Sequence, residues 1–293
     1  MRIKRETLYF YMFISPWIIG FLIFTAYPLL LSLYYSFTEY NAATAPIFVG
    51  LSNFKAIFKD ELFYRSIKAT IIYTITCVPI GLFLSLCFAM LLNRQIPGKT
   101  LFRTFLYFPS MVSGIALSLL WIWIFNPQIG FLNYFLSFFG IKGQMWLQDV
   151  KLALPSLVLM SLWGLGTSTI IFLASLQGVS ESLYEAAKLD GCNSIRRFFN
   201  ITLPMISPVF LFQLVTGLIG GFQVFTQAFV MTKGGPNYST FFYVFYLYQK
   251  GFADFELGYA SGLSWILMVG IVIITFLILK FSNRYVYTEE KRA

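Results

Sequence analysis

Long apolar runs dominate this chain, and short polar stretches separate them. Six runs hold no charged side chain over the length of a membrane span: 8–38, 69–93, 104–141, 152–180, 198–232 and 257–279. A helix needs about 20 apolar residues to cross the hydrocarbon core of a bilayer. None of the runs shows the alternation of a barrel strand. The pattern therefore predicts an all-α integral membrane protein with six transmembrane helices.

Polar and proline residues interrupt some of the runs. The third run is broken at Asn126-Pro127, which leaves an amphipathic helix with the sequence FLNYFLSFFG outside the span. The fifth run contains Pro204 and Pro208 near its start, so we place the beginning of that span near Ile206. A shorter uncharged stretch, 234–249, opens with GGPN and predicts a surface loop and an interfacial helix.

Composition and charge support a membrane location. Hydrophobic residues make up 58% of the chain and charged residues only 11%, compared with about a quarter in soluble domains. Basic residues in short connections, such as Arg94, Lys99 and Arg103, indicate cytoplasmic loops and place both termini in the cytoplasm. We therefore expect a multi-pass protein of the cell (inner) membrane. The net charge of +9 then faces anionic lipids, so a nucleic-acid partner is not needed to explain it.

The residue inventory argues against an enzyme. The sequence has no histidine and no group of carboxylates or cysteines at metal-ligand spacing, so we expect neither catalytic residues nor a metal or cofactor in this chain. The six runs also contain no ionisable residue to couple transport to an ion gradient. This disfavours one alternative, a stand-alone secondary transporter. Six spans without a catalytic domain suggest half of a pore that is completed by pairing.

The cytoplasmic stretch 180–203 predicts two short helices. Ser182 and Glu185 fit a capping box at the start of the first helix, and the Asp190-Gly191 pair ends it. Leu183, Ala186 and Ala187 would share one face of this helix. The two alanines make that face narrow enough to enter a groove on a partner protein.

The second predicted helix begins at Asn193 or Ser194, either of which can cap it. Its apolar side would consist of Ile195, Phe198 and Phe199. An amphipathic interfacial anchor is the alternative explanation of this stretch, but it leaves the small face of the first helix unexplained.

The same stretch carries a specific resemblance. Glu185-Ala186-Ala187, three residues, Gly191, nine residues, Ile201, one residue and Leu203-Pro204 resemble the EAA motif of binding-protein-dependent ABC import permeases at every fixed position. The segments SPWIIGFLIFTAYPLLLSLYYSFTEY and MTKGGPNYST resemble the carbohydrate-uptake branch of that family. The resemblance implies a type I ABC importer permease fold.

The resemblance also implies partners and roles. An extracytoplasmic substrate-binding protein would deliver the sugar, a second homologous permease would complete the path, and two ATPase subunits would bind ATP and Mg. The ATPase-coupling role falls on Glu185, Ala186, Ala187 and Gly191, with Leu183 and Asp190 beside them. Glu185 would make a polar contact with the ATPase, the alanines would allow close packing, and Gly191 would allow the turn.

By the same resemblance, the sugar-facing positions of the maltose permease relative correspond to Ser110, Gly114, Met160, Gly164, Gly217, Gly221 and Val224. If these small residues widen the path, the sugar contacts would fall to Gln223, Gln227 or the partner permease. Most of these residues are small or apolar here. Two readings stay open: the glycines allow helices to pack closely, or they widen a cavity for an oligosaccharide. Transport by a Gly221→Leu variant is the test that the sequence suggests.

We divide the chain into an N-terminal span and external loop at 1–66, a permease core at 67–284 with coupling helices at 180–203, and a cytoplasmic tail at 285–293. The predicted function is the transmembrane permease subunit of an ATP-driven importer for a sugar, most simply an oligosaccharide. A permease for glycerol phosphate or another polyol is the alternative, because such permeases share much of this pattern.

Overall fold

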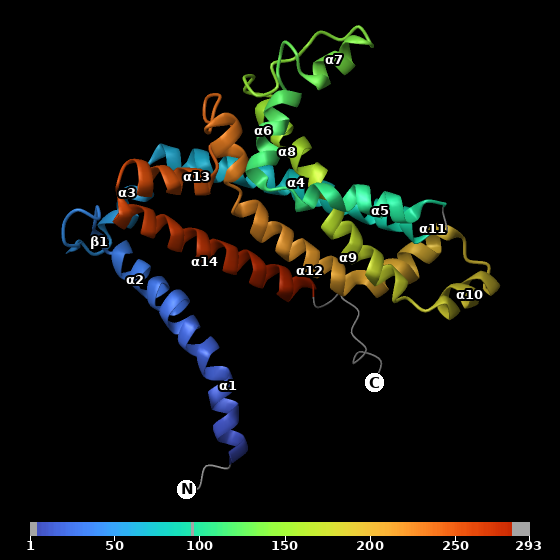
Figure 1. Ribbon diagram of the computed structural model, residues 1–293, viewed down its shortest axis with the longest axis horizontal. Coiled ribbons are helices and arrows are strands. Elements are labelled where there is room, and N and C mark those ends of the chain that lie inside the picture. Colours follow the sequence, from blue (N-terminus) through green and yellow to red (C-terminus); the bar gives the residue numbers. More distant parts are fainter. Residues whose placement is uncertain (1–4, 95–96, 283–293) are drawn as a thin grey trace. The chain divides into compact units, whose positions relative to one another are not determined.

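The computed structural model describes residues 5–94 and 97–282, which are helical apart from one short hairpin and the connecting loops (Figure 1). Four helices are long and apolar enough to cross a membrane singly: Tyr9–Ser36, Glu61–Asn93, Ser194–Phe222 and Leu257–Ser282. Two further pairs of helices are bent by 102° and 49°, and the six predicted spans are accounted for if each pair is one span.

Contacts along the chain define two compact units. Unit 1 comprises the residues up to 61 together with 247–270, and unit 2 comprises 62–246 together with the residues from 271. This grouping differs from the sequence-based division, which kept 247–270 inside one continuous core. The predicted tail, 285–293, lies outside the described residues.

The first span of unit 1 is a long helix with a π-helical turn. It consists of α1 (Arg5–Phe21), η1 (Leu22–Ala26) and α2 (Tyr27–Ser36). Pro28 lies in the first turn of α2 and has no N–H to donate, and the wide turn directly before it accommodates the missing bond. None of the most apolar part of this span is buried within the chain, as expected for a helix that faces lipid.

The rest of unit 1 packs around the start of α14 (Leu257–Ser282). Strands β1 (Thr38–Glu39) and β2 (Ile47–Phe48) form an antiparallel hairpin that is followed by α3 (Ser52–Ile57). The Asn53 side chain donates to the carbonyls of Ser36 and Thr38 at 3.0 and 2.9 Å. A Cβ at Gly258 would lie 2.0 Å from the Thr38 carbonyl oxygen, so only glycine lets α14 begin against this strand.

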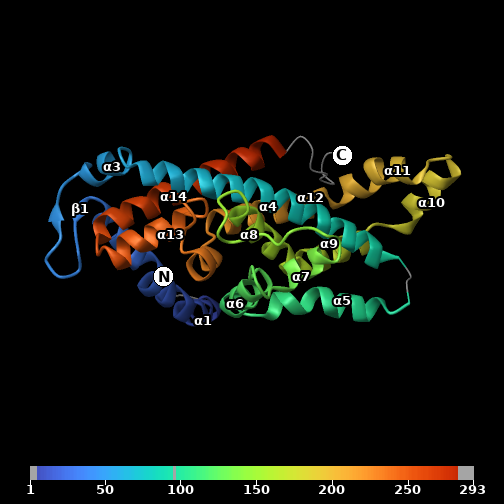
Figure 2. The same cartoon turned by 90° about the horizontal axis from the view of Figure 1, so that it is seen from above.

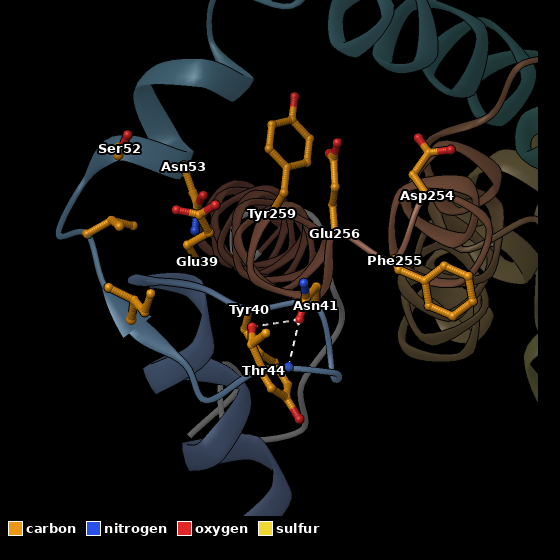
Figure 3. A pocket seen from close by; sticks show the side chains of 12 residues that line it. Glu39, Tyr40, Asn41, Thr44, Ser52, Asn53, Asp254, Phe255, Glu256 and Tyr259 are labelled. Atoms are coloured by element: carbon orange, nitrogen blue, oxygen red, sulfur yellow. Dashed lines mark hydrogen bonds between the residues drawn. The ribbon is translucent and has the colours of Figure 1, made fainter.

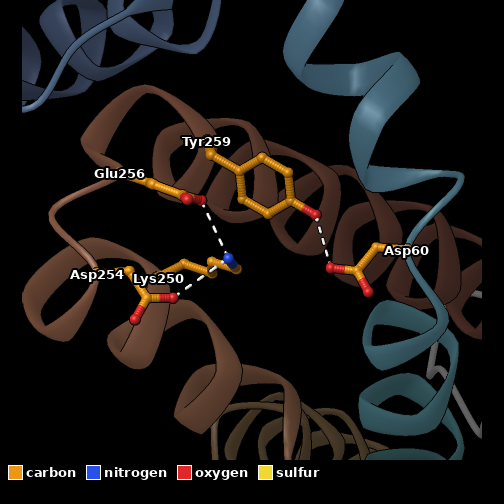
Figure 4. A network of polar contacts seen from close by, with 5 residues as sticks. All are labelled: Asp60, Lys250, Asp254, Glu256 and Tyr259. Atoms are coloured by element: carbon orange, nitrogen blue, oxygen red, sulfur yellow. Dashed lines mark hydrogen bonds and ion pairs between the residues drawn. The ribbon is translucent and has the colours of Figure 1, made fainter.

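A polar network holds the segment that precedes α14 (Figure 4). Lys250 in η6 (Gln249–Ala253) forms ion pairs with Asp254 at 3.2 Å and Glu256 at 3.1 Å. Burial alone would lower the pKa of Lys250, but the hydrogen bonds and negative charges of Glu256 and Asp254 outweigh it and raise this pKa. The Tyr259 hydroxyl donates to Asp60 at 3.1 Å, which links α14 to the residues before α4.

Unit 2 is built on three helices, α4 (Glu61–Asn93), α9 (Gly166–Gln177) and α12 (Leu203–Phe222). Their shared core consists mainly of Val78, Leu82, Leu86, Ala89, Leu92, Phe172, Leu173, Leu176, Val179 and Ile206. Small residues bring α12 onto α4: a Cβ at Gly217 would lie 3.1 Å from Val78, and one at Gly221 would lie 2.8 Å from Thr74. The two helices therefore run antiparallel at close range.

The third predicted span is bent earlier than the sequence suggests. Helix α5 (Lys99–Tyr107) and the 3-10 turn η2 (Phe108–Met111) precede α6 (Gly114–Ile124) across the 102° bend. Our expectation of a continuous span as far as Asn126 was wrong. The chain is extended at Val112 and Ser113, and the Ser113 hydroxyl caps α6 by accepting from the Ala116 N–H at 3.4 Å.

The fourth span is bent where it approaches α5. Helix α8 (Ala153–Ser161) and the 3-10 turn η3 (Leu162–Gly164) precede α9 across the 49° bend. A Cβ at Gly166 would lie 2.1 Å from the Leu106 carbonyl oxygen. Glycine at this position lets the start of α9 rest directly on the backbone of α5.

The segment after α6 matches the predicted amphipathic helix. Helix α7 (Phe131–Ser137) is separate from α6, and its Asn133 is buried. The Asn133 amide donates to the carbonyls of Pro127 and Gln144 and accepts from the Trp146 indole at 2.8 Å. These bonds close the long loop onto itself.

The segment 234–249 lies only partly on the surface: Asn237 and Tyr238 are exposed as expected, but much of the part from Thr240 onward is buried. Thr240, Phe242 and Tyr246 are almost fully buried, and α13 (Tyr243–Tyr248) begins inside the unit. The reason is a contact with α4: the Thr70 hydroxyl accepts from the Tyr243 N–H at 2.8 Å, and Phe242 packs with Ala69 in a second core cluster. A π turn, η5 (Ala228–Thr232), precedes this segment.

Candidate functional site

A wide cavity of about 700 Å³ opens between α4, the bent fourth span and α12 in unit 2. Hydroxyl groups line it from Tyr73, Ser161, Thr167, Ser168, Thr216 and Thr226, and amide groups line it from Gln213, Gln223 and Gln227. None of the described residues that line the cavity carries a charge. The site can therefore exchange hydrogen bonds with a hydroxylated molecule but offers no ion pair.

The cavity brings together most of the predicted substrate-path residues. Seven of them line it: Met160, Gly164, Gly217, Gly221, Gln223, Val224 and Gln227. The other two, Ser110 and Gly114, do not. The Ser110 hydroxyl donates to the Tyr107 carbonyl at 2.6 Å, while a Cβ at Gly114 would face Thr226 at 3.6 Å. A substrate role for any of these residues stays a prediction.

The glycines of the cavity wall have two different environments. Gly164 and Gly220 have open space where a Cβ would be, whereas Gly217 and Gly221 are packed against α4. Within one cavity wall, some glycines therefore allow close helix packing and others leave open space in the cavity. Gly221→Leu is consequently a test of helix packing, and not of cavity size.

Sequence reasoning missed polar residues of α4, α8 and α12. The hydroxyls of Tyr73 and Ser161 share a hydrogen bond, and Gln213 is buried in the cavity wall. The signal was present, because each is a polar group inside an apolar run. The pairing of Tyr73 with Ser161 is a contact over 88 residues, which no local pattern reveals.

The second candidate region is α10 (Glu181–Leu189), which with α11 (Ser194–Arg197) lies at one end of unit 2 (Figures 1 and 2). The capping box at Ser182 was wrong. Ser180 is the N-cap residue, its side chain accepts no capping bond, and its hydroxyl instead shares a hydrogen bond with Ser182 at 2.7 Å. The helix therefore begins at Glu181, before the expected cap.

The predicted end of α10 is confirmed. Gly191 has a φ of +74°, and its N–H donates to the Lys188 carbonyl at 3.1 Å. The Cys192 N–H donates to the Ala187 carbonyl at 2.9 Å. This pair of bonds is a Schellman motif, which uses glycine at the left-handed position to satisfy the last carbonyls of the helix.

The two alanines of the motif point to different surroundings. Ala187 is buried within the chain, whereas Glu185, Ala186 and Leu183 are exposed. The prediction that Leu183, Ala186 and Ala187 form one outward face was thus wrong for Ala187. Ala187 lies on the side of the helix that faces the rest of the chain. On this side the Tyr184 hydroxyl shares a hydrogen bond with the Thr202 hydroxyl at 2.9 Å.

The outward surface of α10 includes one large residue that we did not predict. Leu189 is 89% exposed at the end of the helix, beside Asp190. The surface formed by Leu183, Glu185, Ala186 and Leu189, called the α10 surface below, is small, partly apolar and negatively charged.

The second helix begins where the sequence predicts, since Asn193 caps α11 by accepting from the Arg196 N–H at 2.8 Å. It is not separate from the fifth span, however. A π turn, η4 (Phe198–Thr202), joins α11 to α12, so the helix runs unbroken from Ser194 to Phe222 and does not begin near Ile206. Because Pro204 lacks an N–H, the wide turn before it keeps the helix continuous.

Unit 1 has its own cavity, of about 530 Å³, near the hairpin (Figure 3). Carboxylates of Glu39, Asp254 and Glu256 line it, together with Asn53 and Tyr259. At its edge the Asn41 side chain accepts from the N–H and hydroxyl of Thr44. The negative lining distinguishes this cavity from the uncharged one in unit 2.

Comparisons with known proteins place these features in a family. Residues 77–288 match the family described as "Binding-protein-dependent transport system inner membrane component". The probable ABC transporter permease protein YesP of Bacillus subtilis (strain 168) is 42% identical over 99% of this chain and 95% of its own length. The sn-glycerol-3-phosphate transport system permease protein UgpA of Yersinia enterocolitica is 36% identical, with coverage of 82% and 81%.

A solved structure shares the fold. A crystal structure of a bacterial alginate ABC transporter, in complex with an alginate pentasaccharide-bound periplasmic protein, matches with a TM-score of 0.84 at 22% identity, covering 97% of both chains. The family is a transport component, so the chain is not an enzyme. Its cavity, its membrane helices and these matches lead to one conclusion: the chain belongs to the binding-protein-dependent transport system inner membrane components and is an ABC importer permease subunit.

Proposed function

We propose that this permease subunit passes an uncharged sugar, delivered by an extracytoplasmic binding protein, through the cavity of unit 2. The observation that supports this choice is the lining, which combines hydroxyl and amide groups with Phe225 and no charged side chain among the described residues. Sugar hydroxyl groups both donate and accept hydrogen bonds, as the lining groups do.

The same lining argues against glycerol phosphate, although UgpA is named for that substrate. A phosphate dianion taken from water into a membrane cavity needs an arginine, a lysine or a helix N-terminus to offset its desolvation. The described residues that line this cavity include no cationic side chain. An uncharged oligosaccharide therefore fits better than a phosphorylated polyol.

Energy for transport comes from partner subunits in this proposal. Two ATPases bind ATP and Mg, and the α10 surface enters a groove on one of them. Glu185 supplies a polar contact there, Ala186 allows close approach, and Gly191 sets the angle at which the helix projects. A second homologous permease faces the cavity and completes the path, and both termini lie in the cytoplasm.

The test uses the complete importer in proteoliposomes with its binding protein. We expect uptake of a neutral oligosaccharide and none of glycerol 3-phosphate. Glu185→Lys is expected to reduce ATPase retention and sugar-stimulated ATP hydrolysis at least about tenfold, since it reverses the charge of a contact. Glu181→Lys, on the same helix and also exposed, is the matched control.

Two results would refute the proposal. Uptake of glycerol 3-phosphate in preference to neutral sugars would refute the substrate class. Equal behaviour of Glu185→Lys and Glu181→Lys, both near wild type, would reduce α10 to an interfacial helix.

A further inference from the structure

One amide in the cavity wall has no partner. Gln213 on α12 is only 6% exposed and lines the cavity, and its Nε2 makes no hydrogen bond among the described residues. A buried donor without an acceptor is costly, and native structures rarely keep one without a reason. Gln213 lines the cavity as a residue, but its Nε2 is shielded in this conformation, so the terminal amide must rotate to turn that donor towards a solute.

Gln213 lies nearer the start of α12 than the predicted sugar contacts. It precedes Gln223 by ten residues, a rise of about 15 Å if the helical geometry is followed. It is displaced from Gln223 towards the start of α12, which follows α10 and α11 in the chain. Around it the lining from α4 consists of Val78, Gly81 and Leu82, which offer no polar side chain.

Two other buried polar groups that lack a partner in the described part of the chain provide a comparison for Gln213. The hydroxyls of Thr74 and Ser85 on α4 are also buried without a partner among the described residues, but neither residue lines the cavity. Rotation of its terminal amide can present the donor of Gln213 to a solute, because Gln213 lines the cavity, whereas Thr74 and Ser85 do not line it. All three side-chain groups lack a partner among the described residues, so Thr74 and Ser85 serve as controls for Gln213.

We propose that Gln213 forms a second sugar subsite in the part of the cavity nearer the start of α12, where its amide bonds to a hydroxyl of the leading sugar unit while later units contact the region of Gln223 and Gln227. This inference rests on the proposed function and extends it. A terminal amide suits a hydroxyl because both can donate and accept. The subsite would serve substrates long enough to span both regions, and a monosaccharide bound near Gln223 would not reach it.

The experiment replaces Gln213 with Met in the complete importer and measures uptake of a neutral mono-, di-, tri- and tetrasaccharide. Methionine keeps the length of the side chain and removes the unpaired amide, so the variant is expected to fold. We expect uptake of the longer sugars to fall about tenfold, as for loss of one hydrogen bond, with no change for the monosaccharide. Thr74→Val and Ser85→Ala should match wild type at every length.

The outcomes separate this inference from the proposed function. If the wild-type importer takes up no neutral sugar, both the proposed function and the subsite are overturned. Wild-type uptake of oligosaccharides together with an unchanged Gln213→Met variant would overturn the subsite alone. An equal loss at all lengths, or loss of the second permease on co-purification, would also overturn it, because Gln213 would then act in assembly.

Discussion

Small residues are prominent both in α10 and in the part of α12 that faces the cavity, yet they have different surroundings within each region. In α10, Ala187 is buried and its neighbour Ala186 is exposed. In α12, Gly221 is packed against Thr74 and its neighbour Gly220 faces open space. Successive residues of a helix point about 100° apart, so neighbours of equal size can serve packing in one case and access in the other.

The comparison teaches that a small residue in a membrane protein has no single role. A motif or a glycine-rich stretch predicts where close approach occurs, but the partner in that approach is set by the fold. In α12 the partner is another helix of the same chain for Gly221. In α10 the exposed Ala186 leaves room for another protein in our proposal.

The largest effect is expected from Gly221→Leu compared with Gly220→Leu. A Cβ at Gly221 would already lie 2.8 Å from Thr74, so leucine should overpack the contact between α12 and α4 and cost about 3 kcal/mol or more. Thermal unfolding in detergent should show a clear fall in Tm. Gly220→Leu should keep the wild-type Tm and reduce uptake of sugar, because its side chain enters the cavity.

Equal values of Tm for the two variants would break the comparison in α12. Gly164→Leu provides a check from the other wall, since Gly164 also has open space at its Cβ. It should behave like Gly220→Leu.

A somewhat smaller effect is expected from the two alanines of α10. Leucine at buried Ala187 should destabilise the packing of α10 on the chain by about 1–3 kcal/mol. Leucine at exposed Ala186 should leave Tm unchanged and lower retention of the ATPase on co-purification. A fall in Tm for Ala186→Leu, with full ATPase retention, would contradict the assignment of the two faces.

The sequence was sufficient for features that depend on neighbours along the chain. The six apolar runs, the separate helix at 131–137, the cap at Asn193 and the end of α10 at Gly191 follow from hydropathy, turn residues and capping rules. The family resemblance also led to nine substrate-path residues, seven of which line one cavity.

Features that depend on distant contacts were not predictable in the same way. The bend before α9 needs the approach of Gly166 to the Leu106 carbonyl, and the burial of 240–246 needs Thr70 of α4. The continuous helix through Pro204 needs a π turn, whereas proline in a sequence suggests a boundary. Gln213 stands out in the sequence as a polar side chain in an apolar run, but its place in the cavity wall depends on the helices that pack around it.

Gly191 allows a sharper test of backbone conformation alone. Its φ is +74° and no atom lies within 4 Å of the position that a Cβ would take, so alanine there should cost about 1–2 kcal/mol through the left-handed conformation and not through a clash. Gly178, which ends α9 in a right-handed conformation, is the matched control. Gly178→Ala should be neutral or slightly stabilising, and Tm with sugar-stimulated ATP hydrolysis should distinguish the pair.

The smallest effect is expected at the hydrogen bond that docks α10 on the π turn η4, directly before α12. Tyr184→Phe keeps the ring packed and removes the hydroxyl that bonds to Thr202 at 2.9 Å. The expected loss is about 1 kcal/mol, with ATPase retention close to wild type because the α10 surface is unchanged. A double-mutant cycle with Thr202→Val measures the coupling between the two side chains, which should be positive and below about 1.5 kcal/mol. Independent effects of the two substitutions would mean that the hydrogen bond adds nothing to the docking of α10, and that the packing of Ala187 and of the Tyr184 ring against the core holds its inner face.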